Sequence, residues 1–302
     1  MIMESRVYHG KVILFGEYSM IFGSPALLMP YYPSSARWQY AENSNDEFAM
    51  SSSRSLYDFL SYLLENEDVN SVLDLMAFKK DLDEGLYFAS DIPYGYGVGS
   101  SGALTAAVYE RYCIDKAVDN VLLRSLLASM ENCFHSTSSG LDPMQCYYGR
   151  PFVINEDKSL TMLEKDFMPD DVHVFLLDSK VKSNTGQLVS YFRERYADKG
   201  FYVDFQRLYY PNVKKCITSL VNGDSKDFYE NLSELSYYQT VMMRPMIPDS
   251  MMPYFSSRIE TEHFQVKICG SGGGGFLLGF ADDKNKVNCL MNKNKVKIIW
   301  LM

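Results

Sequence analysis

Apolar residues recur along the chain with two different periods, which predicts a mixture of strands and helices. Short runs with strand character occupy Val7–Phe15, Ala26–Met29 (closed by Pro30), Gly85–Ser90 and His173–Asp178. Apolar residues at helical spacing occupy Leu56–Leu64, Ser101–Cys113 and Val121–Phe134. Because the two kinds of element do not alternate strictly, the pattern favours an α+β protein.

The second half of the chain adds two predicted hairpins and a long helical region. The hairpins join Pro151–Asn155 to Leu160–Leu163 across a polar turn, and Phe264–Cys269 to Phe276–Phe280 across Ser271 and four glycines. A largely helical stretch is expected from Gly186 to about Glu262, and a last strand at Lys295–Leu301. The sequence contains no internal repeat and no low-complexity linker.

The composition is that of a globular protein with an acidic balance. Hydrophobic residues make up 47% of the 302 residues and charged residues 22%, with a formal net charge of -9. Binding to a nucleic-acid backbone needs clustered Lys and Arg, so we expect no nucleic-acid partner. The charge balance still permits a local pocket for a small anionic substrate.

The cysteines and the apolar runs both indicate a cytoplasmic protein. Six cysteines are scattered without a C-x-x-C pair, which is typical of free buried thiols in a reducing compartment. The N-terminal residues lack the pattern of a signal peptide, and no stretch approaches the roughly 20 apolar residues of a membrane span. We therefore expect a soluble protein that has no membrane partner and is not exported.

A glycine-rich segment before the predicted helix Ser101–Cys113 is the strongest local signal for a ligand. It reads Pro93-Tyr94-Gly95-Tyr96-Gly97-Val98-Gly99-Ser100-Ser101-Gly102-Ala103. Alternate glycines permit positive φ and a close approach of backbone to ligand, and free amides at a helix start bind anions. The paired serines could cap the helix or meet a phosphate or a magnesium ion. The segment is neither a P-loop nor a Rossmann fingerprint. Taken alone, it also fits a flexible surface loop.

Two further segments carry weaker signals. Lys267-Ile268-Cys269-Gly270-Ser271-Gly272-Gly273-Gly274-Gly275-Phe276 places four successive glycines between apolar strands. Such a run is entropically costly unless the backbone must pass close to something, although a loose hairpin tip is the alternative. Gly10-Lys11-Val12-Ile13-Leu14-Phe15-Gly16-Glu17-Tyr18 is a strand that begins near a cation and ends at a carboxylate. By itself it fits an ordinary strand with solvated charged ends.

Together the three segments resemble the signature segments of the GHMP kinases (galactokinase, homoserine kinase, mevalonate kinase, phosphomevalonate kinase), in the same order and with similar spacing. The resemblance implies an α+β, two-domain GHMP kinase fold. Residues 1–168 would form a ribosomal protein S5 domain 2-like N-terminal domain that binds ATP, and residues 169–302 a ferredoxin-like C-terminal domain. The boundary falls in the polar stretch Lys165–Asp171. ATP and Mg²⁺ are the cofactors that the resemblance implies.

The segment after the glycine-rich loop distinguishes the branches of this family. It reads Glu131-Asn132-Cys133-Phe134-His135-Ser136-Thr137-Ser138-Ser139-Gly140-Leu141-Asp142 and is similar to the mevalonate kinase segment E-x-x-x-H-x-x-x-S-G-x-D. The four-residue spacing predicts Glu131 and His135 on one face of a helix. Singly, the two fit equally a solvated carboxylate and a core or capping histidine. Asp178–Thr185 also resembles a basic Ser/Thr loop of that branch, or an ordinary N-cap at Thr185.

The sequence departs from the family pattern at positions that bear on the acceptor. Mevalonate kinases usually read G-E-H in the first segment, and their His helps to contact substrate, whereas this chain has Tyr18. In the third segment Cys269, Ser271 and Phe276 replace the usual Thr, Ala and Cys. These departures leave the kinase prediction intact and bear on which acceptor is used.

The resemblance implies distinct roles for the candidate site residues. The residues expected to bind the ATP phosphates are Pro93, Gly95, Gly97, Val98, Gly99, Ser100, Ser101 and Gly102. Ser101 and Glu131 would hold Mg²⁺, and Asp142 would accept the proton of the acceptor hydroxyl with Lys11 beside it. The residues expected to contact the acceptor are Glu17, Tyr18, His135, Ser139, Gly140, Gly270, Ser271 and Gly272.

The expected function is phosphorylation of mevalonate to 5-phosphomevalonate, for isoprenoid precursor synthesis, by a monomer or homodimer. The alternatives are a kinase of another polar alcohol (sugar, sugar-phosphate or phosphomevalonate), a decarboxylase of the same fold, or a non-catalytic ligand sensor. Galactokinases normally carry Arg where Lys11 stands, and homoserine kinases lack an equivalent of Asp142. A sensor would have lost Lys11, Glu131 or Asp142, and all three are present.

Overall fold

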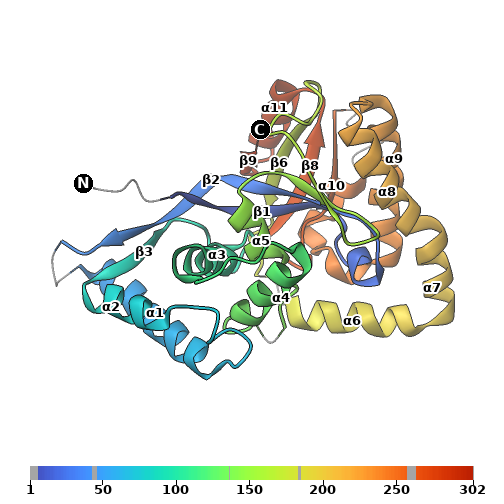
Figure 1. Cartoon of the computed structure of the whole chain (residues 1–302). Coiled ribbons are helices and arrows are strands. Elements are labelled where there is room, and N and C mark those ends of the chain that lie inside the picture. Colours follow the sequence, from blue (N-terminus) through green and yellow to red (C-terminus); the bar gives the residue numbers. More distant parts are fainter. Residues whose placement is uncertain (1–5, 43–45, 136, 183–184, 257–262, 302) are drawn as a thin grey trace. The chain divides into compact units, whose positions relative to one another are not determined.

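The computed structural model describes residues 6–42, 46–135, 137–182, 185–256 and 263–301, and it mixes helices with antiparallel sheets (Figure 1). Its contacts divide the chain into two compact units. The first unit comprises Met1–Lys11, Pro30–Tyr94 and Val98–Arg150, and the second Val12–Met29, Gly95–Gly97 and Pro151–Met302. The fold is therefore of the predicted α+β class. The boundary expected near residue 168, between two domains that are continuous in sequence, stays a prediction.

The strands follow the predicted apolar runs, with one correction. They are β1 Tyr8–Phe15, β2 Ala26–Tyr40, β3 Leu86–Ser90, β4 Phe152–Ile154, β5 Leu160–Met162, β6 His173–Asp178, β7 Phe264–Ile268, β8 Phe276–Ala281 and β9 Ile298–Trp300. The prediction that Pro30 closes the second strand is wrong, because β2 continues to Tyr40. Pro30 lies between the part of β2 that pairs with β4 and the part that pairs with β3, so it removes no bond to either strand.

The helices cover the predicted helical segments and add others. They are α1 Glu47–Glu65, α2 Leu75–Asp83, α3 Ser100–Tyr112, α4 Asn120–Glu131, α5 Leu141–Tyr148, α6 Thr185–Ala197, α7 Lys199–Asp204, α8 Tyr210–Val221, α9 Ser225–Met242, α10 Met252–Ser256 and α11 Lys284–Lys293. The sequence analysis missed α2, α5 and α11. All three are short, and the side chains of Asp74 and Asp283 accept from the first amides of α2 and α11. The end predicted for the helical region, Glu262, lies outside the described residues.

The first unit is organised around α3. This helix is buried on most sides, and Ala103, Ala106 and Ala107 are fully buried. Their small side chains let α4 and α5 pack directly against it (Figure 1). In the same unit, β3 pairs antiparallel with the Ala36–Tyr40 part of β2 and packs against α1. Helix α3 is thereby held in place by α4 and α5.

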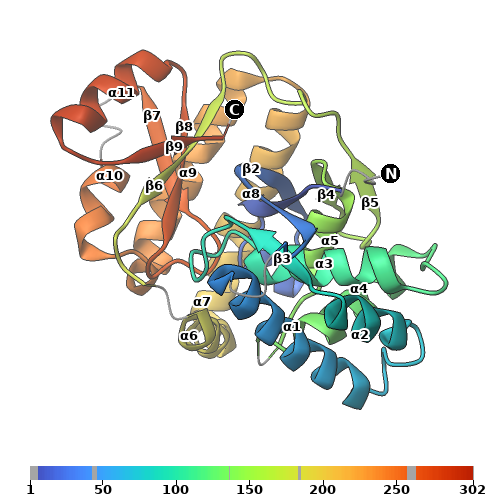
Figure 2. The same ribbon diagram turned by 90° about the vertical axis from the view of Figure 1, so that its left-hand side faces the viewer.

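The second unit contains an antiparallel sheet in the order β7-β8-β6-β9 (Figure 2). Asp178 of β6 pairs with Phe276 of β8, and Ile268 of β7 pairs with Leu277, so the Gly-rich connection lies at one end of the sheet. Both predicted hairpins are therefore confirmed. Strands β7 and β8 are buried throughout, and α9 packs against β7.

The expectation that the cysteines are buried is confirmed only in part. Cys146 and Cys216 are buried thiols as expected, whereas Cys113, Cys133 and Cys269 are half-buried and Cys289, on the polar helix α11, is exposed. No helix in the described part of the chain combines the length and the hydropathy that a membrane-spanning helix requires.

Candidate active site

Helix α3 starts with a glycine at its N-cap position. Gly99 lies in the left-handed region (φ 82°) and has no side chain to accept from the first amides of the helix. Ser100 and Ser101 stand in the first helical turn, so the prediction that they cap the helix is wrong. Gly95 and Gly97 also have positive φ, and a methyl group at either would meet open space. The helix thus offers uncapped amides at its positive end, which is the arrangement that binds anions.

Two glycines, Gly10 and Gly99, allow Lys11 to lie directly against the start of this helix. A methyl group at Gly99 would lie 2.8 Å from Cγ of Lys11, and one at Gly10 would lie 2.2 Å from the carbonyl oxygen of Val98. The amide of Lys11 donates to that same carbonyl at 2.8 Å. Only glycine permits this approach, and it holds the buried side chain of Lys11 beside the N-terminus of α3.

A second close approach brings in Asp142, which lies in the first turn of α5. A methyl group at Gly102 would lie 2.8 Å from the carbonyl carbon of Asp142 and 2.9 Å from the nitrogen of Pro143. Gly140, with φ 72°, is the N-cap of α5, and a methyl group there would meet the carbonyl oxygen of Arg124 at 2.2 Å. The starts of α3 and α5 therefore meet, and Asp142 lies in the first turn of α5.

Lys11 and Asp142 form an ion pair. The distance from Nζ of Lys11 to Oδ1 of Asp142 is 3.0 Å. The lysine side chain is 6% exposed and the aspartate 30% exposed, so one partner is sheltered and the other is open to solvent. A carboxylate that is accessible on one side and backed by a buried cation is suited to receive a proton from a bound hydroxyl.

Glu131, the last residue of α4, is a buried carboxylate beside this pair. Its two oxygens accept from Oγ of Ser101 at 3.0 Å and from Oγ of Ser138 at 2.5 Å. Burial, and secondarily the charge of Asp142, raises the pKa of Glu131 to about 7, against the effect of these hydrogen bonds. A divalent cation would favour the ionised form. The hydroxyl of Ser101 and the carboxylate of Glu131 are hard oxygen donors 3.0 Å apart, which fits Mg²⁺.

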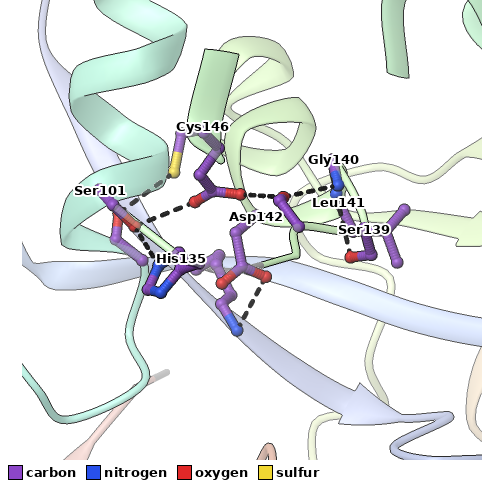
Figure 3. Close-up of polar contacts among 11 residues, drawn as sticks. Ser101, His135, Ser139, Gly140, Leu141, Asp142 and Cys146 are labelled. Atoms are coloured by element: carbon purple, nitrogen blue, oxygen red, sulfur yellow. Dashed lines mark hydrogen bonds and ion pairs between the residues drawn. The ribbon is translucent and has the colours of Figure 1, made fainter. Parts of the chain in front are cut away.

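His135 lies close to Ser101, but it does not share a helix face with Glu131, as the spacing predicted. Helix α4 ends at Glu131, and the chain then turns, with the amide of Phe134 donating to the carbonyl of Glu131. Nε2 of His135 is 3.0 Å from Oγ of Ser101 (Figure 3). The spacing correctly brought Glu131 and His135 together, but a turn, and not a shared helix, is the reason.

Ser138, Ser139 and Gly140 connect these groups to Asp142. Nε of Arg124 on α4 donates to the carbonyl of Ser139 at 2.8 Å, and the amide of Gly140 donates to Oγ of Ser138 at 2.9 Å. Ser138 was not predicted as a site residue, although it stands in the same serine-rich run. In the structure Ser139 and Gly140 support the start of α5, and their contact with an acceptor stays a prediction.

In the second unit, Glu17 is engaged by a residue that the sequence analysis missed. Its carboxylate forms an ion pair with Nζ of Lys267, and both side chains are almost completely buried. The ammonium also donates to the carbonyl of Ile268 at 2.7 Å and lies over the ring of Phe15. Lys267 stands in the quoted third segment, but an alternating strand pattern gives no sign that a lysine is buried.

Tyr18 is also buried and engaged within the second unit. Its hydroxyl donates to the carbonyl of Ser271 at 2.5 Å, and its ring packs on Phe192 with the ring centroids 4.5 Å apart. Burial, and secondarily the nearby Glu17, raises the pKa of Tyr18. The first and third sequence segments are thus joined at Tyr18–Ser271 and Glu17–Lys267. Contacts of Glu17, Tyr18, Gly270, Ser271 and Gly272 with an acceptor stay predictions.

The basic loop after β6 is described only in part. The amide of Lys180 donates to Oδ1 of Asp178 at 2.9 Å, and Nζ of Lys180 lies 3.3 Å from Oδ2 of the same carboxylate. Ser183 and Asn184, which the sequence analysis placed in this loop, lie outside the described residues. Helix α6 begins at Thr185.

One family model and several known proteins are similar to this chain. Residues 67–150, which include the glycine-rich loop and helices α2 to α5, match the model of the GHMP kinases N terminal domain. A mevalonate kinase of Archaeoglobus fulgidus is 24% identical over 295 residues, covering 95% of each chain.

Solved structures of several GHMP kinases share the fold of the whole chain. A mevalonate kinase of L. major in complex with R-mevalonate has a TM-score of 0.68 at 14% identity, covering 97% of this chain and 91% of that one. A phosphomevalonate kinase of Streptococcus pneumoniae in complex with phosphomevalonate and AMPPNP has a TM-score of 0.65 at 14% identity, covering 98% of each chain. A galactokinase of Lactococcus lactis has a TM-score of 0.67 at 12% identity, covering 98% of this chain and 93% of that one. The predicted resemblance and fold are confirmed.

We predict that Glu131→Gln stabilises the metal-free protein in a pH-dependent way. Because the pKa of Glu131 is raised in the folded state to about 7, ionising it costs folding free energy. The cost is absent below the ordinary carboxyl pKa, grows as the pH rises through about 7 and is then constant. The variant should gain on the order of 3 kcal/mol in unfolding free energy at pH 8, and this gain should vanish towards pH 4.5.

Thermal unfolding in EDTA between pH 4.5 and 8.5 measures this difference. Glu65→Gln, at an exposed position on α1, is the matched control and should show little pH-dependent change. A constant difference between Glu131→Gln and the wild type at every pH would contradict the raised pKa.

We also predict that Lys267→Met destabilises the second unit strongly. Removing the ammonium leaves the carboxylate of Glu17 buried without its cation, which typically costs about 3–5 kcal/mol. Urea unfolding measures the loss, and the double variant Glu17→Gln/Lys267→Met should recover much of it. Lys180→Met removes a 71% exposed ammonium and should cost less than about 1 kcal/mol. Equal losses of unfolding free energy in Lys267→Met and Lys180→Met would contradict the prediction that burial makes the Glu17–Lys267 ion pair the more important of the two.

Proposed function

We propose that this chain, which carries a GHMP kinase N-terminal domain within a GHMP kinase fold, is an ATP-dependent kinase of a small-molecule hydroxyl. One observation carries the proposal. The Lys11–Asp142 ion pair and the Ser101–Glu131 pair lie at the same end of α3, where the helix presents uncapped amides. A phosphoryl transfer enzyme needs these elements: an anion site, oxygen ligands for a cation and a base for the acceptor.

The phosphates of ATP would bind at the N-terminus of α3. The glycines of the loop hold positive φ, so that the backbone can come close to phosphate oxygens, and the helix dipole favours their negative charge. Ser101 and Glu131 would hold Mg²⁺, which when bound neutralises charge on the β- and γ-phosphates. The same charge would keep Glu131 ionised at neutral pH.

Asp142 would act as the general base. Its carboxylate takes the proton of the acceptor hydroxyl as that oxygen bonds to the γ-phosphorus and the bond to the β-phosphate oxygen breaks, which releases ADP. Lys11, with Nζ 3.0 Å from Oδ1 of Asp142, would orient the carboxylate and stabilise the charge that develops on the transferring group. His135, with Nε2 3.0 Å from Oγ of Ser101, would lie beside the bound phosphates, and its contact with the acceptor stays a prediction.

Mevalonate is the proposed acceptor, with 5-phosphomevalonate as product. The proposal is supported by the segment from Glu131 to Asp142 and by the similarity to a mevalonate kinase along 95% of the chain. Phosphomevalonate and sugars are the second candidates, because kinases named for phosphomevalonate and galactose share the fold with TM-scores of 0.65 and 0.67, close to the 0.68 of the L. major mevalonate kinase. A sensor without activity is less favoured, because Lys11, Glu131 and Asp142 are present and in contact or adjacent.

The proposal predicts that Asp142→Asn lowers kcat by about 10²–10⁴-fold, because the amide cannot accept the proton. The Kd for ATP should stay nearly the same, since the start of α3 is untouched. Stopped-flow or coupled ADP-release assays give kcat, and calorimetric titration gives the Kd. Asp115→Asn, on the exposed loop after α3, is the matched control and should retain wild-type kcat. Near-normal turnover by Asp142→Asn would exclude the general-base role.

A coupled ADP-release screen with mevalonate, phosphomevalonate, galactose and a panel of sugars tests the acceptor. We expect mevalonate to give the highest kcat/KM, with no release of carbon dioxide. The Lys11→Met/Asp142→Asn double variant sets the background for ATP hydrolysis. A higher kcat/KM for phosphomevalonate or for a sugar would show that mevalonate is not the preferred acceptor. Rates no higher than those of the double variant with every acceptor would favour a non-catalytic ligand sensor.

A further inference from the structure

Ser138 lies between the carboxylate of Glu131 and the start of α5, and all of its contacts described below are within the first unit. Its Oγ is 2.5 Å from Oε2 of Glu131, and the amide of Gly140, the N-cap of α5, is 2.9 Å from the same Oγ. The amide of Ser138 donates to Oδ1 of Asn132 at 2.7 Å, which ties this serine to the end of α4. Ser138 therefore joins the end of one helix to the beginning of the next.

The direction of the hydrogen bond between Ser138 and Glu131 follows from the neighbouring bond. A backbone amide can only donate, so Oγ of Ser138 accepts from Gly140. The single hydrogen of the hydroxyl is then left for Oε2 of Glu131. Because an ionised carboxylate accepts on both oxygens, this bond supports the charged form of Glu131 in one orientation.

The two carboxylate oxygens of Glu131 are consequently in different situations. Oε2 is held by Ser138, whereas Oε1 is 3.0 Å from Oγ of Ser101. Oγ of Ser101 also lies 3.0 Å from Nε2 of His135, so the hydroxyl of Ser101 is shared between two partners. Oε1 is therefore the oxygen of Glu131 that is available to a cation held together with Ser101.

The position of Glu131 makes a fixed donor important. Glu131 is the last residue of α4 and 2% exposed, so its carboxylate is shielded from water and lies at the negative end of the helix dipole. Both effects oppose a negative charge at this point. A buried polar side chain keeps one orientation where its hydrogen bonds are satisfied, and Ser138 is a donor whose own backbone is anchored to Asn132.

We propose that Ser138 is a positioning residue for the divalent cation at Glu131. Its hydroxyl holds Oε2 of Glu131 and so directs Oε1 toward Ser101, while Ser138 itself does not touch the cation. The inference rests on the proposed function, in which Ser101 and Glu131 hold Mg²⁺. Groups that hydrogen-bond a metal-ligating side chain typically contribute about 10–100-fold to metal affinity, which sets the size of the expected effect.

Binding of AMPPNP, a non-hydrolysable analogue of ATP, measures the contribution of the cation without turnover. This contribution is the Kd of AMPPNP in EDTA divided by its Kd in saturating Mn²⁺, both from calorimetric titration. We expect Ser138→Ala to lower this ratio by about 10-fold through a weaker Mn²⁺ complex. The Kd in EDTA should stay at the wild-type value, a split that a general loss of structure would not produce. Ser138→Thr keeps the hydroxyl and should restore the ratio.

Ser129→Ala is the matched control, because Oγ of Ser129 on α4 also donates to a carboxylate, that of Asp68 at 3.1 Å. It should leave the ratio at the wild-type value. Glu131→Gln tests the proposed function separately, since it removes the carboxylate itself. If Glu131→Gln lowers the ratio and Ser138→Ala does not, or if Ser138→Ala and Ser138→Thr lower it equally, the proposal is overturned. An unchanged ratio in Glu131→Gln would refute the metal site of the proposed function, and this inference with it.

Discussion

Close contact between backbone segments, permitted only by glycine, is the constraint on which the candidate active site depends. Gly102 lets the start of α3 touch the start of α5, and Gly99 lets Lys11 pass beside the same helix start. A single methyl group at either position would meet backbone or side-chain atoms at 2.8 Å, well inside contact distance. The glycines therefore do two things that the sequence does not distinguish. They leave the first amides of α3 without a side-chain cap, and they bring Lys11 and Asp142 together.

This convergence also sets the electrostatics of the site. Glu131 and Asp142 are close enough that the charge of Asp142 helps to raise the pKa of Glu131, and burial contributes more. Lys11 balances part of this negative charge and is itself buried. The metal-free site thus holds a carboxylate that is costly to ionise, and a bound cation would remove that cost. Glu131 is thus the carboxylate of this site whose ionisation a bound cation would favour most.

The two glycine-rich segments show how one residue type serves different purposes. At the start of α3, Gly95 and Gly97 adopt positive φ with open space around them, which suits a ligand. In the turn after β7, Gly272 and Gly273 are required because the protein packs against itself. Tyr18 and Lys267 complete this packing with two long-range contacts. The third segment is accordingly a supporting element within the second unit.

The sequence by itself determined the α+β class, both hairpins and most helices, because these depend on local periodicity. The grouping of Lys11, Ser101, Glu131 and Asp142 was expected only from the resemblance to the GHMP kinases, since no local pattern brings together residues so far apart in the chain. The sequence analysis placed the end of β2 wrongly, because whether a proline ends a strand depends on which neighbour each residue pairs with. It put His135 on a helix face that does not exist, since helix ends depend on contacts beyond the helix. Only the tertiary structure decided that Glu17 and Tyr18 are buried against Lys267 and Ser271, because residues about 250 positions apart meet only after folding.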